Sequence, residues 1–137
     1  MSDPKFAKFD VHDGTVYKTV KGLDLQVAVL VPKTIRTDAP SPLLVHWHGG
    51  GYMMGHRLFA PWTAQWFLQL AESQGAVVLS PDYRLLPEAS SDDMFEDVQD
   101  FWSWVHSALP AEIARISNGT TSVDVAKIAV GGESAGV

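Results

Sequence analysis

The chain has 137 residues, of which 46% are hydrophobic and 19% are charged, and these values are typical of a folded domain rather than a disordered segment. Its net charge of −6 argues against binding to nucleic acid or to an anionic membrane surface, both of which call for a basic patch. The absence of cysteine excludes disulfide scaffolds, thiolate nucleophiles and cysteine-based metal sites.

The first residues are polar and lack the apolar segment of a secretory signal peptide. No apolar run approaches the roughly 18 residues that a membrane-spanning helix needs. These features predict a cytoplasmic protein without a membrane span.

The first predicted elements are two short strands, over residues 15–20 and 25–31, which are rich in β-branched residues. Lys21 and Gly22 are expected to form the turn between them. Residues 42–48 are mostly apolar, as in a strand buried on both faces of a parallel sheet, and three glycines follow.

A helix is predicted to begin near Pro61 and to end at Gly75. Its expected core face consists of the large apolar residues Trp62, Trp66, Phe67 and Leu70. Residues 76–83 form the next apolar run and predict a second buried strand.

Ser90 and Ser91, followed by two aspartates, indicate the start of another helix. Pro110 interrupts it, and residues 127–130 predict a third buried strand. The apolar stripe of this helix consists of Met94, Val98, Phe101, Val105 and Leu109. Strands and helices therefore alternate, which is the order of an α/β fold with a mostly parallel sheet and helices on both faces.

A G-x-S-x-G motif, Gly132-Glu133-Ser134-Ala135-Gly136, comes directly after the last predicted strand. A nucleophile on a sharp strand-to-helix turn needs strained backbone angles, and side chains at the flanking positions would collide with neighbouring backbone. Gly132 and Gly136 meet that requirement. The pattern predicts Ser134 as a nucleophile, with the N–H of Ala135 directed at the oxygen that becomes negative in a tetrahedral intermediate.

A second glycine-rich motif, His48-Gly49-Gly50-Gly51, follows another predicted strand. Consecutive glycines let backbone N–H groups face a ligand without obstruction, so this loop is expected to supply an oxyanion hole, with His48 fixing the loop. A plain flexible turn is the alternative interpretation. A phosphate-binding loop is disfavoured because no Gly-Lys-Ser/Thr follows.

The three segments "HWHGGGYMMG", "DYRLLPE" and "GGESAGV" together resemble the hormone-sensitive-lipase-like branch of the α/β-hydrolase superfamily, whose members are serine esterases and related hydrolases. The resemblance extends from about residue 14 to residue 137. It implies an α/β-hydrolase fold and hydrolysis of a small-molecule carboxylic ester through an acyl-enzyme, without cofactor or metal. It also implies Ser134 as the nucleophile, and Gly50, Gly51 and Ala135 as oxyanion-hole donors. The residues expected to support these motifs structurally are His48, Gly49, Gly132, Gly136, Asp82, Tyr83, Arg84 and Glu88.

The chain departs from the family pattern after the nucleophile. The family's catalytic order is Ser, then Asp or Glu, then His, but only Ala135, Gly136 and Val137 follow Ser134 here. All five histidines lie upstream, and neither a substitute triad nor a metal site at His46, His48 and His56 is favoured. The acid and the base of the catalytic triad are therefore expected to be absent from this chain. It resembles a hydrolase truncated just after the nucleophile elbow, the sharp turn at residues 132–136 that carries Ser134.

Residues 1–137 are thus expected to form a single partial α/β-hydrolase domain, in which residues 1–13 are a short arm and no substantial cap is present. The family's sheet has about eight strands, of which five are expected here. Residues 127–130 would then be an open edge strand, which favours self-association and low stability. Without a base, the chain alone is expected to show no measurable turnover.

Two hypotheses follow from the sequence. One is the N-terminal part of a serine esterase, and the other is a non-catalytic family member that binds a ligand or a partner. The sequence does not distinguish an esterase from an amidase, a lactonase or a deacetylase, because these enzymes share the same machinery.

Overall fold

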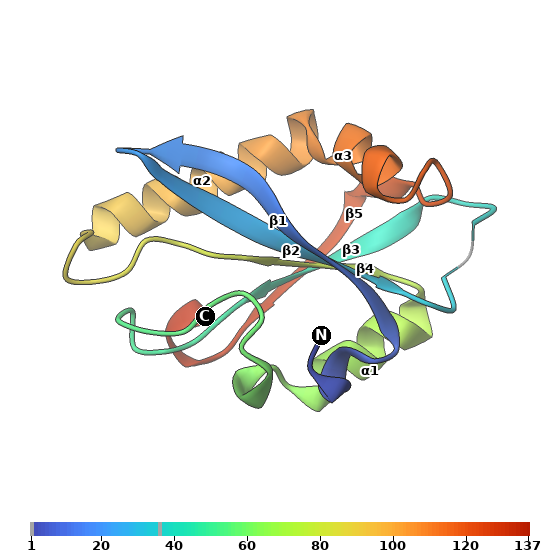
Figure 1. Cartoon of the computed structure of the whole chain (residues 1–137), viewed down its shortest axis with the longest axis horizontal. Coiled ribbons are helices and arrows are strands. Elements are labelled where there is room, and N and C mark those ends of the chain that lie inside the picture. The colour runs from blue at the N-terminus through green and yellow to red at the C-terminus, as the bar shows by residue number, and fades with distance from the viewer. Residues whose placement is uncertain (1, 36) are drawn as a thin grey trace.

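A computed structural model describes residues 2–35 and 37–137. Met1, the first residue of the expected N-terminal arm, lies outside this description. The described strands form one five-stranded sheet in the order β1-β2-β4-β3-β5, and helices lie along both of its faces (Figure 1). The predicted α/β architecture is confirmed. β2 runs opposite to the other four strands, so the sheet is mixed.

Strands β1 (Phe9–Val20) and β2 (Leu23–Pro32) form an antiparallel hairpin, and the turn lies at Lys21 and Gly22 as predicted. Both of these residues have positive φ angles, 50° and 77°. β1 begins earlier than the sequence indicated, because a short 3-10 helix, η1 (Pro4–Phe6), leads into it and Phe6 and Phe9 are buried. The second half of the expected arm therefore belongs to the sheet.

Strands β3 (Ser41–Trp47) and β4 (Val77–Pro81) run parallel at the centre of the sheet and are buried along almost their whole length. Their apolar character predicted this position. β5 (Val123–Gly132) pairs with β3 and is the outer strand on that side. The prediction that residues 127–130 are buried is wrong, because Val130 is 59% exposed. The expectation of an open edge strand is confirmed, since no described strand lies beyond β5.

Helix α1 (Gln65–Gln74) follows a 3-10 turn, η2 (Ala60–Trp62), and therefore begins later than predicted. Gly75 ends it in the left-handed conformation, as the sequence indicated. The predicted core face is wrong in part. Phe67, Leu68 and Ala71 are buried, whereas Trp66 is 63% exposed.

Helix α2 (Ser91–Ser107) begins with a capping box in which Ser90 and Asp93 each accept a hydrogen bond from the other's backbone N–H. The predicted stripe is buried except at Val98. Pro110 does not end helical structure, because a separate helix, α3 (Leu109–Ile116), begins one residue before it. Proline is favoured in the first turn of a helix, where its missing N–H has no partner to lose. The sequence pattern did not indicate this helix.

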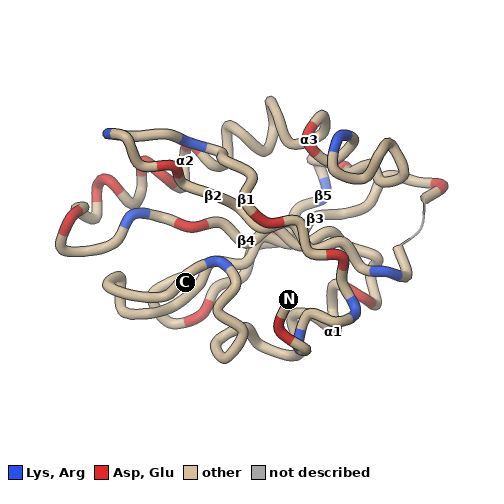
Figure 2. The backbone as a smooth tube through the Cα atoms, in the orientation of Figure 1, with Lys and Arg blue, Asp and Glu red and all other residues tan. Residues whose placement is uncertain are grey.

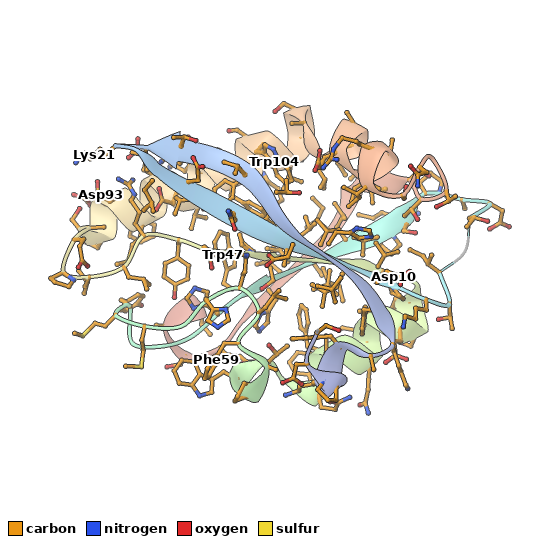
Figure 3. The ribbon with its side chains drawn as sticks, in the orientation of Figure 1. Asp10, Lys21, Trp47, Phe59, Asp93 and Trp104 are labelled. Carbon is orange, nitrogen blue, oxygen red and sulfur yellow. The ribbon has the colours of Figure 1, made fainter. Side chains whose placement is uncertain are left out.

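The sheet separates two hydrophobic cores. The larger lies between the sheet and helices α2 and α3, and Phe101 is at its centre with Tyr17, Trp47 and Trp104 around it, at ring-centroid distances of 5.1, 5.3 and 5.9 Å. Trp47 and Trp104 are labelled in Figure 3. The smaller core packs α1 and η1 against the opposite face.

Charged residues lie on the outer elements and loops, while β3 and β4 carry none (Figure 2). Among the residues that the structure describes, no helix is long and apolar enough to cross a membrane.

Replacement of Phe101 by alanine tests the larger core. We expect Phe101→Ala to lower the free energy of unfolding by about 3–5 kcal/mol, because it removes a ring that is 1% exposed and leaves a cavity. Phe95→Ala on the same helix removes a ring that is 70% exposed and should change stability by less than about 1 kcal/mol. Urea unfolding followed by circular dichroism measures both, and equal losses would contradict this assignment of the core.

Candidate active site

Ser134 lies immediately beyond β5, in a short 3-10 turn, η3 (Ser134–Gly136). Its φ angle is 52°, in the left-handed region that side chains other than glycine rarely adopt. The side chain is exposed, and within residues 2–35 and 37–137 its hydroxyl has no hydrogen-bond partner. The sequence places a serine on a sharp turn, and the backbone there has the strain that such a turn requires.

The two glycines that flank Ser134 stand where a side chain would collide with backbone. A Cβ on Gly132 would lie 2.0 Å from the carbonyl oxygen of Gly136, and a Cβ on Gly136 would lie 2.2 Å from that of Trp47. Neither contact can be relieved by rotating a side chain. The elbow therefore fits against the end of β3 only with glycine at both positions.

The glycine loop after β3 passes directly against this elbow. A Cβ on Gly49 would lie 2.7 Å from the carbonyl oxygen of Glu133 and 3.3 Å from Cβ of Ser134. Gly50 and Gly51 have φ angles of 128° and 63°, which glycine tolerates readily. The two motifs, more than 80 residues apart in sequence, thus meet at the same end of the sheet.

Three backbone donors remain unused at this place. Among the described residues, the N–H groups of Gly50, Gly51 and Ala135 donate to no protein acceptor. Unused N–H groups beside an exposed hydroxyl are the donors that an oxyanion hole requires.

His48 and Tyr83 hold the glycine loop in place. Their rings stack with centroids 4.5 Å apart, and the Tyr83 hydroxyl donates to the carbonyl oxygen of His48 at 2.7 Å. A further bond of 2.7 Å, from the N–H of Leu86 to the carbonyl of Tyr52, joins the loop to the segment after β4. The glycine loop is therefore braced by a ring contact and by two hydrogen bonds to the segment after β4.

The environment of these two side chains keeps both of them neutral. Burial, followed by the neighbouring Tyr52, raises the pKa of Tyr83 to about 12. Burial lowers the pKa of His48 below its usual 6.5. Because a carbonyl oxygen only accepts, the 2.8 Å contact between Nδ1 of His48 and the carbonyl of Gly49 places the proton on Nδ1. Neutral His48 is thus suited to bracing the loop.

Asp82 is held in a charged network behind the loop. It accepts from the N–H of Arg57 at 2.8 Å and also pairs with the Arg57 guanidinium, which in turn reaches Asp13 on β1 at 2.6 Å. The Tyr17 hydroxyl donates to the carbonyl of Asp82 at 2.5 Å. The network ties the loop between β3 and α1 to the hairpin and to the end of β4.

Arg84 pairs with Asp97, a carboxylate on α2 that is fully buried. This hydrogen-bonded pair raises the pKa of the Arg84 guanidinium above its usual value. Lys18 on β1 also reaches Asp97, at 2.8 Å. Asp82, Tyr83 and Arg84 therefore connect structural elements through these contacts.

Glu88 has no such structural connection. It is exposed, has no partner among the described residues, and lines an open cavity of about 500 Å³ behind the loop, together with His48 and His56. The residues that sequence reasoning missed are Arg57, Asp97 and the side chain of Glu133. Their partners lie on other elements, so no local pattern marks them.

A second cavity, of about 400 Å³, opens beside Ala135. Its walls are mostly apolar and come from the glycine loop, β3, α2 and the end of β5; they include Trp47, Tyr52, Met94, Phe95 and Val130. An apolar hollow beside the unused N–H of Ala135 can accept the apolar part of a small molecule.

The described residues contain no group of three or more histidine, aspartate or glutamate side chains placed to hold a metal ion. His46, His48 and His56 therefore do not converge. His46 lies near Glu133, with 3.3 Å between Nε2 and Oε1, while His48 bonds to Gly49.

The sequence matches the profile of the α/β hydrolase fold family over residues 44–137. The chain belongs to this family. Its resemblance to the hormone-sensitive-lipase-like hydrolases is thereby confirmed, and the family's known members include ester hydrolases.

Several of the similar proteins are named as esterases. The chain is 41% identical over 134 residues to the probable carboxylesterase M8 of a Phoma species. This match covers 96% of the chain and 41% of M8. It is 44% identical over 61 residues to the probable carboxylesterase clz11 of Cochliobolus lunatus, covering 44% of this chain and 28% of clz11. Among solved structures, the esterase of Pyrobaculum calidifontis matches with a TM-score of 0.68 and 32% identity, over 96% of this chain and 38% of that protein. The chain thus spans less than half the length of these relatives.

The lowered pKa of His48 predicts a loss of stability in mild acid. Because the unfolded chain binds a proton at higher pH than the folded chain does, the free energy of unfolding should fall as the pH drops below about 6.5. His48→Asn keeps a donor for Gly49 and removes this titration, so the loss between about pH 6.5 and 5 should become smaller. Urea unfolding at a series of pH values measures the effect, with His12→Asn as the control. An unchanged acid dependence in His48→Asn would contradict the assignment.

Proposed function

We propose that this chain supplies the nucleophile and the oxyanion hole of a serine carboxylesterase, with Ser134 as the nucleophile. The observation that carries the proposal is the position of Ser134. Its exposed hydroxyl lacks a partner among the described residues and stands at a φ angle of 52°, beside a glycine loop whose N–H groups are unused. The names of the relatives as carboxylesterases support the same reaction class.

The proposed reaction begins when Oγ of Ser134 attacks the acyl carbon of an ester. The carbonyl oxygen gains negative charge and accepts hydrogen bonds from the N–H groups of Gly50, Gly51 and Ala135. A general base takes the proton of Ser134 and gives it to the alcohol as the bond between the acyl carbon and the alcohol oxygen breaks. The acyl group stays on Ser134 until water attacks it and releases the carboxylic acid. No cofactor or metal takes part in these steps.

The general base and its acidic partner are proposed to lie outside these 137 residues. Residues 135–137 include neither an acid nor a histidine, and the similar carboxylesterase M8 is more than twice as long as this chain. His46 and His48 do not substitute, because both are buried and each is bonded to another group. A serine hydroxyl without a base is a poor nucleophile at neutral pH.

The intact mass of the native protein from its source cells is the first measurement. A mass of about twice 15.0 kDa or more identifies the protein to be assayed with p-nitrophenyl esters. In that protein Ser134→Ala should lower kcat by roughly 10⁴- to 10⁶-fold. The 137-residue chain by itself should show no measurable turnover, with or without Ser134. Full activity of Ser134→Ala in the longer protein would overturn the proposal.

A non-catalytic role in binding is the second candidate. The uncovered strand β5 and the apolar cavity beside Ala135 favour it, because either can receive another molecule. A native mass of 15.0 kDa would select this candidate over the enzyme.

We further propose that isolated copies of the chain associate through β5, with a second copy as the partner. Unpaired N–H and C=O groups along an outer strand are a template for pairing with another chain, and Val130 is an exposed apolar residue on this strand.

Sedimentation velocity over a range of concentrations tests this association. The unmodified chain should sediment above 15.0 kDa, and Val130→Lys should shift it toward the monomer, because charge on an outer strand opposes pairing. Val98→Lys, on the partly exposed side of α2, is the control and should leave association unchanged. A monomer at all concentrations would refute the proposal.

A further inference from the structure

The side chain of Glu133, the residue before Ser134, connects the elbow to two other elements. Its Oε1 accepts from the backbone N–H of Ala64 at 2.6 Å, and the same oxygen lies 3.3 Å from Nε2 of His46 on β3. Ala64 immediately precedes α1. One carboxylate therefore links the elbow, the start of α1 and the end of β3.

Helix α1 gains an anion at its N-terminus from this arrangement. Ala64 occupies the N-cap position, and its own side chain makes no capping bond. A carboxylate near the N-terminus of a helix interacts favourably with the helix dipole and with the unpaired N–H groups there. The position of Glu133 is thus fixed by the start of α1 as well as by the end of β5, which directly precedes it.

The backbone around Glu133 is fixed at the same place. Its N–H donates to the carbonyl of Trp47 at 3.2 Å, and its carbonyl accepts from Gly136 at 2.9 Å. A Cβ on the neighbouring Gly131 would lie 2.9 Å from the ring of Phe67 on α1. That ring also packs against the imidazole of His46, with centroids 5.2 Å apart. Hydrogen bonds of both its side chain and its backbone therefore fix the position of Glu133.

The contact with Glu133 also determines which nitrogen of His46 carries the proton. A carboxylate only accepts, so Nε2 of His46 must be protonated. His48, two residues along the same chain, carries its proton on Nδ1 because it donates to Gly49. Two neighbouring histidines therefore take opposite tautomers, and each assignment follows from the acceptor it contacts.

We infer that Glu133 is a positioning residue, which holds Ser134 against the glycine loop through its bonds to Ala64 and His46. The inference rests on the proposed role of Ser134 as the nucleophile. A displacement of about 1 Å at a reacting atom can lower a rate by roughly 10²-fold, so a group that fixes the elbow contributes to the reaction without touching the substrate.

Nitrogen-15 NMR of the imidazoles tests the link without any activity. In the unmodified chain, His46 should be protonated at Nε2 and the amide of Ala64 should exchange slowly. In Glu133→Ala, His46 should lose its preference for protonation at Nε2 and the amide of Ala64 should exchange faster. Glu133→Gln should keep the tautomer and the slow exchange, because its amide oxygen still accepts both hydrogen bonds. Asp124→Ala is the matched control, since it removes a carboxylate on β5 that also accepts a backbone N–H, from Ala126. It should leave His46 and Ala64 unchanged.

Labelling with a fluorophosphonate tests the consequence for Ser134 in the native protein, followed as an increase in intact mass. Glu133→Ala should slow labelling by about tenfold or more, and Glu133→Gln should restore it to within about threefold of the unmodified rate. Each variant is compared at a temperature at which its circular dichroism shows it to be folded.

The outcomes separate this inference from the proposed function. Loss of the His46 signature together with slow labelling in Glu133→Ala, and recovery of both in Glu133→Gln, supports the positioning role. An unchanged labelling rate, or an unchanged His46 tautomer, in a folded Glu133→Ala protein overturns it. Failure of the unmodified protein to label at Ser134 refutes the proposed nucleophile, while the imidazole and amide data still decide whether the link exists.

Discussion

The parallel pairing of β3 with β5 is the constraint on which the site depends. It places His46 opposite Gly131 and Trp47 opposite Gly132, so the two strands end at the same level. Both glycine motifs begin at that level, and a Cβ on Gly49 would lie only 3.3 Å from Cβ of Ser134. A shift of one residue in this pairing would separate the loop from the elbow by about 3.3 Å, which is more than any oxyanion contact tolerates.

The loops beyond these strands depend on buried charge. Asp97 is fully buried and forms ion pairs with Arg84, on the segment after β4, and with Lys18 on β1. In a second network, the guanidinium of Arg57 bonds to both Asp82 and Asp13. Removing one partner from a buried pair costs about 3–5 kcal/mol, because the other charge is left uncompensated. These ion pairs hold residues that flank the glycine loop: Arg57 after the loop, and Asp82 and Arg84 after β4. They fix the base of the loop and leave its N–H groups unused.

Much of this arrangement could be predicted from the sequence, because the relevant signals are local. Ser90 and Asp93 form a capping box that identifies the start of α2. Gly132 and Gly136 indicate positions at which a side chain would collide with neighbouring backbone. The core face of α1 could not be predicted in the same way. Large apolar residues suggested Trp66 as well as Phe67, whereas the helix buries Ala71 with Phe67 and exposes Trp66, since close packing on the sheet favours a small residue there.

Other features could not be predicted because their causes are not local. Glu133 and Ala64 are 69 residues apart, and nothing in either segment indicates their hydrogen bond. The composition of β5 resembles that of the buried strands and wrongly suggested burial; only the strand order of the related family indicated the open edge at which the described sheet places it. Position in the sheet, not residue type, decides the burial of such a strand.

The strained backbone at Ser134 gives these long-range contacts a common physical role. A residue other than glycine in the left-handed region costs about 1–3 kcal/mol and persists only where its surroundings over-determine it. Here the carbonyl of Trp47 excludes a side chain at Gly136 and accepts from Glu133, whose carboxylate is held in turn by α1 and His46. The strain at one residue is thus offset by packing against β3 and by hydrogen bonds to two further elements. For the proposed attack by Ser134, a hydroxyl held in this way is already in place before the substrate arrives, which lowers the entropic cost of the reaction.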